Sequence, residues 1–396
     1  MLQSLFHNWE RRLAATTTDR VVRPFDWGLD WIPENGHHTT AAPADRLGHW
    51  ISEVMVDSDA FFTPPPTTDY TLTSNWSLPA EAHRENEGLP AEAHRENEGL
   101  PSEARSAKEG DLLTFPSAFT TPHHENNTVY ARYFPARLKP SRSGSTADRN
   151  AKASAERRGA AAGPAAVLVL PQWNSTADGH IGLSKLLAWS GMSALRLSLP
   201  YHDWRMPPEL HRADYIVSAN VARTVQVCRQ AVLDARRAIA WLAARGYERI
   251  GILGSSLGSC LALLTTAHEP LIRVEALNHI SPHFADVVWR GLSTRHVREG
   301  LDGHIELDLL RTLWRPISPR WYLERLRDRK TLLVYARYDL TFPPDLSEDL
   351  VAAFRELRIP HEVATLRCGH YTTGKAPFKF IDGWLLTRFL KRALAV

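Results

Sequence analysis

The stretch RIGILGSSLGSCLALL, residues 249–264, places a Gly-x-Ser-x-Gly motif between two apolar segments. RIGIL is typical of a buried strand, and the residues after the motif continue as an apolar helix. A strand, a sharp turn and a helix in this order form a nucleophile elbow, which lifts the central serine above the carboxyl edge of a parallel sheet. Ser256 is therefore predicted to be a nucleophile; the alternative is a Gly/Ser-rich turn without chemistry.

A serine hydroxyl needs a base, and the base needs an acid that orients it. After an elbow of this kind the acid comes first along the chain and the histidine second. Asp339 ends the apolar strand KTLLVYARYD, and His370 follows the strand HEVATLRC. We predict that these two residues complete the set, with Asp286 and Asp345 as rival acids.

An oxyanion formed at Ser256 needs backbone N–H donors. Leu257, the first residue of the following helix, supplies one, and the helix N-terminus adds partial positive charge. The second donor is expected in the loop Pro171-Gln172-Trp173-Asn174, after the strand AAVLVLP. Because proline has no N–H, Gln172 and Trp173 are the candidates, and we favour Trp173.

Strands and helices alternate from residue 165 to the end of the chain, which predicts a parallel sheet with helices on both faces. Residues 282–329 break this alternation, since they have helical character and no strand. Such an insertion could form a helical lid. Trp289, Trp314 and Trp321 within it would then be an apolar roof, or simply packing residues.

The remaining segments divide the chain into regions. Residues 1–77 are predicted to be an N-terminal extension packed on the core, and residues 111–396 the main domain. Residues 78–110 hold an 11-residue repeat, LPAEAHRENEG, twice intact and once decayed, which we expect to be mobile. The Ser- and Ala-rich residues 140–164 are expected to be a flexible loop.

Composition narrows the class of protein. The chain has 396 residues, 43% of them hydrophobic, and a net charge of +3, which is too small to indicate a nucleic-acid partner. Three cysteines without a secretory context suggest reduced thiols. No signal peptide or apolar run long enough to span a membrane is visible, so a cytoplasmic location is expected. An apolar stripe at helical spacing could dock on the protein or touch a membrane surface; it comprises Leu2, Leu5, Phe6, Trp9 and Leu13.

Other polar residues follow predicted strands and should face the same edge of the sheet. His202 and Asp203 follow ALRLSLP, and His279 follows RVEALN. They could bind substrate, although a network of hydrogen bonds within the loops is the alternative. His123 and His124 have no ligand partner at a recognisable spacing, which argues against a metal site.

Taken together, the motifs Gly-Ser-Ser-Leu-Gly, Tyr-Asp-Leu-Thr and Cys-Gly-His resemble those of the α/β-hydrolase superfamily over residues 111–396. Blocks such as LPYHDWRMPPELHRADY and LNHISPHFADVVW are most similar to abhydrolase-domain-18-like bacterial proteins. The resemblance implies an α/β fold with an eight-stranded, mostly parallel sheet, and hydrolysis through an acyl-serine without a cofactor. Many members carry His-Gly where this chain has Pro171-Gln172.

The sequence thus predicts a serine hydrolase of the α/β class acting on a small carboxylic ester or thioester. A peptidase or an acyltransferase is an alternative, because the same three side chains serve amides and other acceptors. A catalytically silent binding protein with this fold is the alternative from another class.

Overall fold

The structure is a computed structural model that describes residues 2–33, 40–74, 110–136 and 163–395. Almost all of the repeat at 78–110 and of the predicted loop at 140–164 lies outside the described residues.

Within the described residues nine strands form one sheet, in the order β1-β2-β3-β5-β4-β6-β7-β8-β9. The strands are β1 (Thr71–Thr73), β2 (Asp111–Pro116), β3 (Thr128–Phe134), β4 (Ala165–Leu170), β5 (Ser193–Leu197), β6 (Arg249–Ser255), β7 (Ile272–Asn278), β8 (Lys330–Ala336) and β9 (His361–Leu366). Strands β1 to β3 and β5 pair antiparallel, whereas β5, β4 and β6 to β9 are parallel. The sheet therefore has one strand more than the eight expected, because the short β1 extends its antiparallel edge.

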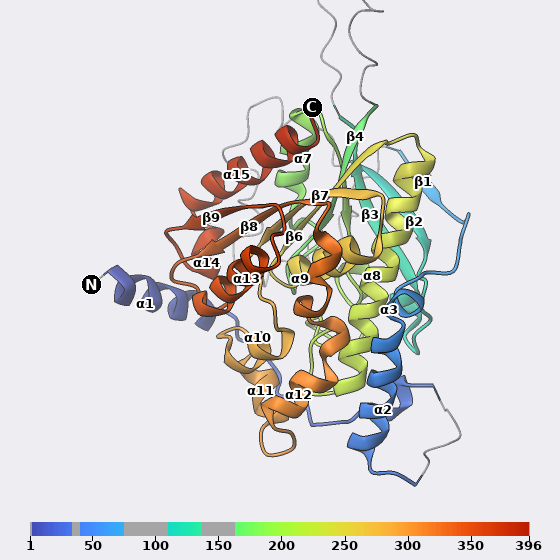
Figure 1. The fold of residues 1–396 in the computed structure, drawn as a ribbon, viewed down its shortest axis with the longest axis vertical. Helices are drawn as coiled ribbons and strands as arrows, with labels where there is room; N and C mark the ends of the chain where they lie inside the picture. Colours follow the sequence, from blue (N-terminus) through green and yellow to red (C-terminus); the bar gives the residue numbers. More distant parts are fainter. Residues whose placement is uncertain (1, 34–39, 75–109, 137–162, 396) are drawn as a thin grey trace, which may run out of the picture.

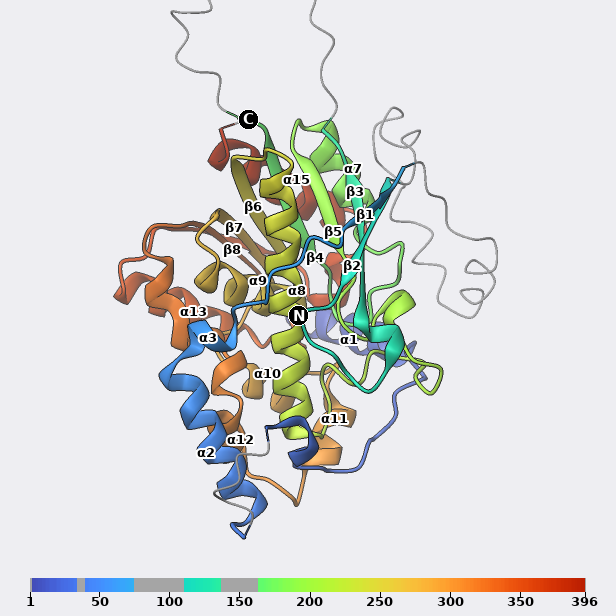
Figure 2. The same ribbon diagram turned by 90° about the vertical axis from the view of Figure 1, so that its right-hand side faces the viewer.

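Helices cover both faces of this sheet (Figures 1 and 2). The helices of the main domain are α7 (Ile181–Trp189), α8 (Val221–Ala244), α9 (Leu257–His268), α10 (Phe284–Arg290), α11 (Arg295–Leu301), α12 (Leu307–Leu313), α13 (Pro344–Glu356), α14 (His370–Thr373) and α15 (Phe378–Ala393). The N-terminal region contributes α1 (Leu2–Ala15), α2 (Pro43–Val56) and α3 (Ser58–Phe61). None of the described helices is both long enough and apolar enough to cross a membrane.

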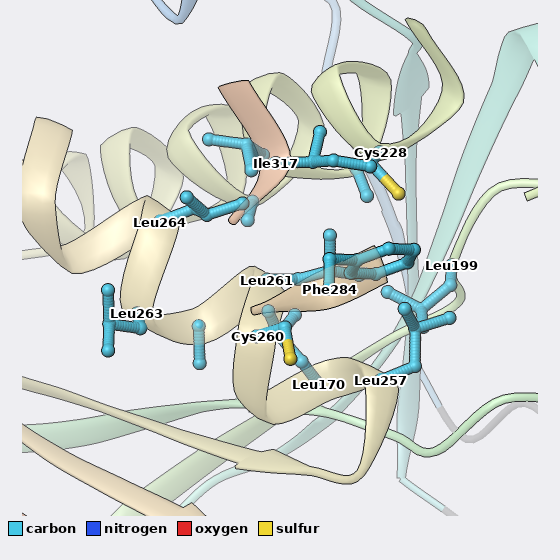
Figure 3. Packing of buried hydrophobic residues seen from close by; sticks show 14 of the residues in the cluster. Leu170, Leu199, Cys228, Leu257, Cys260, Leu261, Leu263, Leu264, Phe284 and Ile317 are labelled. Carbon is cyan, nitrogen blue, oxygen red and sulfur yellow. The ribbon is translucent and has the colours of Figure 1, made fainter. Parts of the chain in front are cut away.

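Two apolar clusters fix the layers. Helices α8, α9 and α13 pack on one face of the sheet, and Figure 3 shows how Leu257, Cys260 and Leu261 of α9 meet Phe284 of α10 there. Helices α7 and α15 pack on the other face. The three cysteines are free and buried within this packing, in agreement with reduced thiols. The alternation of strand and helix is thus a direct consequence of covering both faces of a parallel sheet.

The N-terminal region packs on the main domain. Leu47, Trp50 and Ile51 of α2 join the large apolar cluster. The predicted stripe of α1 docks on the protein only in part, because Phe6 packs on the second apolar cluster and Glu10 is fully buried, whereas Leu2 and Leu5 are exposed. A buried carboxylate, together with the aromatic ring of Phe6, makes the contact.

Residues 282–329 are helical, as predicted, and contain α10, α11 and α12. Trp314 is fully buried and its indole N–H donates to the carbonyl of Val221, so this tryptophan is a packing residue. Trp321 is 52% exposed and lies under the guanidinium of Arg315.

Candidate active site

Ser256 stands at a strained turn between β6 and α9. Its backbone dihedrals are φ 55° and ψ −120°, a conformation that residues with a Cβ rarely adopt. A Cβ on Gly254 would lie 2.2 Å from the carbonyl oxygen of Gly258, and one on Gly258 would lie 2.3 Å from that of Leu170. Both glycines of the motif are therefore required for the turn to form.

Asp339 follows β8 and is almost fully buried, and both of its carboxylate oxygens accept hydrogen bonds. Its Oδ1 accepts the backbone N–H groups of Thr341 and Phe342, each at 2.7 Å. Its Oδ2 accepts Nδ1–H of His370 at 3.0 Å and Nδ1–H of His279 at 2.8 Å. Burial raises the pKa of Asp339, but the charge of His370 and the hydrogen bonds from both histidines outweigh it and hold the pKa well below its usual range.

His370 begins α14, directly after the loop that leaves β9. The ring of Phe342 stacks on its imidazole, with the centroids 5.4 Å apart. Burial lowers the pKa of His370, but the carboxylates of Asp339 and Glu10 together raise it by more. Its pKa therefore lies above the ordinary value. With Nδ1–H donated to Asp339, the Nε2 of the neutral ring is left to accept a proton.

Glu10 reaches this loop from α1, more than 350 positions earlier in the chain. Its Oε2 accepts the N–H of Tyr371 at 3.0 Å, and its Oε1 accepts the N–H of Thr372 at 2.9 Å. These are two of the N–H groups that open α14 and would otherwise be unpaired. Glu10 thus holds the histidine loop in place; the predicted apolar stripe of α1 gave no signal for it.

A cavity of about 690 Å³ opens beside Ser256 and His370. Its inner wall also includes Gln172, Asn278 and His279. Helices α7 and α15 supply most of the rest, through apolar side chains such as Leu183, Leu186, Trp189, Phe380 and Trp384, and through Lys379, Arg388, Lys391 and Arg392. In the described lining no residue comes from 282–329, so the lid and its tryptophan roof remain a prediction that the cavity does not support.

Asn278 and Asp382 form a polar pair in the wall of the cavity. The Nδ2–H of Asn278 donates to Oδ2 of Asp382 at 2.9 Å. Burial raises the pKa of Asp382 to about 7, against a smaller lowering by this hydrogen bond. The backbone carbonyl of Asn278 accepts the N–H of Ser256 at 2.8 Å, which ties this pair to the turn.

The predicted oxyanion donors are arranged unequally. Leu257 is the first residue of α9, so its N–H lies at the helix N-terminus beside Ser256. Gln172 lines the cavity. The side chain of Trp173 instead donates its indole N–H to the carbonyl of Ala213 and stacks on His296. The backbone donors Leu257 and Trp173 stay predictions, and Gln172, the other candidate, lies nearer the cavity.

His202 and Asp203 have structural partners. His202 is fully buried; its Nδ1–H donates to the carbonyl of Pro200 and its Nε2 accepts the N–H of Asn174. Asp203 pairs with Arg196 at 2.6 Å inside the protein. Neither residue is among those that line the described cavity. This placement favours the alternative, a hydrogen-bond network in the loop, over the predicted contact with substrate.

The rival acids are held elsewhere. Asp286 forms a pair with Arg311, and Asp345 forms one with Arg290. Asp339 is the acid that the structure brings to His370.

His279, Asp339 and His370 also have the composition of a metal site, since their ligand atoms lie within 4.8 Å of one another. Both histidine–carboxylate distances are ordinary for hydrogen bonds, which account for the cluster without an ion. His123 and His124 point to Tyr201, Glu209 and Glu125 instead.

Comparison with known proteins gives likeness of structure only. No family model and no curated protein matches the sequence. The acetyl xylan esterase from Paenibacillus sp. R4 superposes with a TM-score of 0.52 at 15% identity, over 96% of this chain and 98% of that one. The acylaminoacyl peptidase of Pyrococcus horikoshii gives 0.51 at 13% identity, over 67% of this chain and 39% of that one, so this chain spans less than half of the peptidase. The mostly parallel sheet, its flanking helices and these likenesses show that the chain has the α/β-hydrolase fold.

Proposed function

We propose that the protein is a serine hydrolase that cleaves a carboxylic ester or thioester through an acyl-serine. One observation carries the proposal: a serine on a strained turn shares a cavity with a histidine whose other ring nitrogen is held by a buried carboxylate. The likeness to an esterase and a peptidase supports hydrolysis at a carbonyl but does not choose between them.

In the proposed reaction the Oγ of Ser256 attacks the carbonyl carbon of the substrate. His370 Nε2 takes the hydroxyl proton and then gives it to the leaving alkoxide or thiolate. Asp339 keeps Nδ1 protonated and stabilises the imidazolium that forms. The N–H of Leu257, with a second donor from the Gln172-Trp173 segment, binds the oxyanion. Water then attacks the carbonyl carbon of the acyl-serine while His370 Nε2 takes its proton. The bond from this carbon to Oγ breaks, Oγ receives the proton from His370, and the carboxylic acid leaves.

The test is labelling with a fluorophosphonate, which reacts with a serine that a histidine activates. We expect the wild-type protein to be labelled, and Ser256→Ala and His370→Ala to lose the label. Ser255→Ala is the matched control, because Ser255 is the adjacent serine and lines the same cavity. Labelling that survives in Ser256→Ala, or an unlabelled folded wild type, would contradict the proposal and favour a silent binding protein.

The bond that is cleaved is tested with matched chromogenic substrates. We expect turnover of p-nitrophenyl acyl esters and of acyl thioesters to exceed that of p-nitroanilides carrying the same acyl group. Preferential cleavage of the anilides would identify a peptidase, and transfer to an added alcohol an acyltransferase. The kinship with abhydrolase-domain-18-like proteins and the cytoplasmic location remain predictions from the sequence.

A further inference from the structure

His279 is held in an unusual position at the end of β7. Its backbone φ is 56°, in the left-handed region that residues other than glycine rarely adopt. Its N–H donates to the carbonyl of Val334, and its own carbonyl accepts the hydroxyl of Ser259. The side chain is 4% exposed, and its Nδ1 is turned toward Asp339. Backbone bonds on both sides therefore fix a strained residue whose ring points at the catalytic carboxylate.

Two imidazoles donate to one carboxylate oxygen. The Nδ1–H groups of His279 and His370 both reach Oδ2 of Asp339, and the two ring centroids are 4.6 Å apart. Since Nδ1 of His279 carries its proton, the other nitrogen of the neutral ring has none. That Nε2 is buried and has no partner among the described residues, although the residue lines the cavity. Leaving a buried nitrogen without a hydrogen-bond partner costs free energy.

The two rings differ in the charge they can carry. Burial lowers the pKa of His279, and the neighbouring His370 lowers it further against the opposing effect of Asp339. A second imidazolium beside His370 would repel it. His279 is therefore the less basic of the two rings, and His370 is the one that takes up a proton first.

A neutral donor on Asp339 has a defined effect on His370. The carboxylate shares its negative charge with His279, so it holds the His370 imidazolium less strongly than it would alone. The carboxylate is held at both oxygens, since Oδ1 accepts two backbone N–H groups and Oδ2 accepts the two imidazoles.

Further ionisable groups lie near His370 on two other elements, and α15 also brings four basic residues to the lining of the cavity, Lys379, Arg388, Lys391 and Arg392. Glu10 lies on α1, and Asp382 on α15 lines the same cavity. Glu10 raises the pKa of His370, whereas a donor on Asp339 acts in the opposite direction.

We propose that His279 is a positioning residue of the hydrolytic centre: as a neutral imidazole it donates to Asp339 and so weakens the hold of this carboxylate on the proton of His370. This inference rests on the proposed function, since it assigns His370 as the base.

Two variants separate this role from a merely structural one. His279→Gly removes the donor and accepts the positive φ, so the backbone is not strained further. His279→Asn keeps a side-chain N–H close to the position of Nδ1 and also tolerates a positive φ. The readout is the rate of fluorophosphonate labelling from pH 5 to 9, which needs no knowledge of the substrate.

We expect the acidic limb of the profile to move up by about half to one pH unit in His279→Gly, because the unshared carboxylate binds the His370 proton more tightly. Labelling at pH 6 should then be about three to ten times slower, and His279→Asn should keep the wild-type limb. An unmoved limb in His279→Gly, or equal shifts in both variants, would overturn the role of His279 and leave the proposed function standing. An unlabelled wild type would overturn the proposed function, and this inference with it.

Discussion

The loops after β5 and β7 each place a buried histidine near the active edge, yet the two histidines serve different ends. His202 uses both ring nitrogens in hydrogen bonds to its own and a neighbouring loop, and burial lowers its pKa to about 4. His279 uses one nitrogen, on Asp339, and leaves the other without a described partner. Burial and position at a strand end are the same for both. What separates a loop-building histidine from one tied to the chemistry is where its hydrogen bonds go.

Removing the carboxylate that His279 and His370 share should cause the largest loss of activity. In Asp339→Asn an amide replaces one acceptor oxygen, so His370 loses the partner that keeps Nδ1 protonated. We expect kcat/KM for an ester, and the labelling rate, to fall by about 10³- to 10⁴-fold at pH 7.

The matched control for that variant is Asp345→Asn, since Asp345 pairs with Arg290 on the surface. We expect its activity to stay within about twofold of the wild type, because exposed ion pairs contribute little. A loss below tenfold in Asp339→Asn would show that another group orients the base.

A substitution in the loop after β5 should lower the stability of the protein and leave the reaction at Ser256 unaffected. Asp203 and Arg196 form a pair that is fully buried, and Asp203 also accepts the hydroxyl of Ser198. Asp203→Asn leaves Arg196 with an uncompensated buried charge, so we expect the free energy of unfolding to fall by about 3–5 kcal/mol. Urea titration measures this loss, and the labelling rate of the folded fraction should be close to that of the wild type.

Glu324→Gln provides the comparison for that measurement, because Glu324 pairs with Arg327 at the surface. We expect a change in the free energy of unfolding of less than about 1 kcal/mol. If Asp203→Asn instead stays stable but labels slowly, the β5 loop belongs to the active site and the difference between the two histidines disappears.

The sequence predicted the parts of the site that depend on local order. The elbow is a continuous strand, turn and helix, and Asp339 and His370 each come just after a strand that ends at the same edge. Parallel strands bring such positions together whatever the details of packing. The fold class followed from the same alternation of strand and helix.

The parts that it missed depend on contacts between distant segments. Glu10 meets the backbone of Tyr371 and Thr372, beside His370, only because α1 docks against α14. The course of the cavity between α7 and α15, and not beneath 282–329, depends on how the side chains of these helices pack. The ninth strand, β1, is a short TLT segment whose pairing with β2 no local pattern indicates. Hydrogen-bond partners, which distinguish His202 from His279, are likewise set by tertiary structure.

The smallest expected effect concerns Glu10, and its sign is opposite to that of removing His279. The Glu10 carboxylate raises the pKa of His370, so Glu10→Gln should lower that pKa and move the acidic limb of the labelling profile down by about half a pH unit. His370 would then be a free base at lower pH, and labelling at pH 6 should be about two to three times faster than in the wild type. The neutral amide keeps one acceptor for the N–H groups of Tyr371 and Thr372, so the loop should remain folded.

Glu299→Gln, an exposed change on α11, serves as the control and should leave the limb in place. A limb that moves up in Glu10→Gln would mean that Glu10 acts by holding the His370 loop in position and not by its charge. Because His279→Gly and Glu10→Gln are expected to move the same limb in opposite directions, the pair of variants tests whether a shared donor and a nearby carboxylate together set the pH at which His370 works.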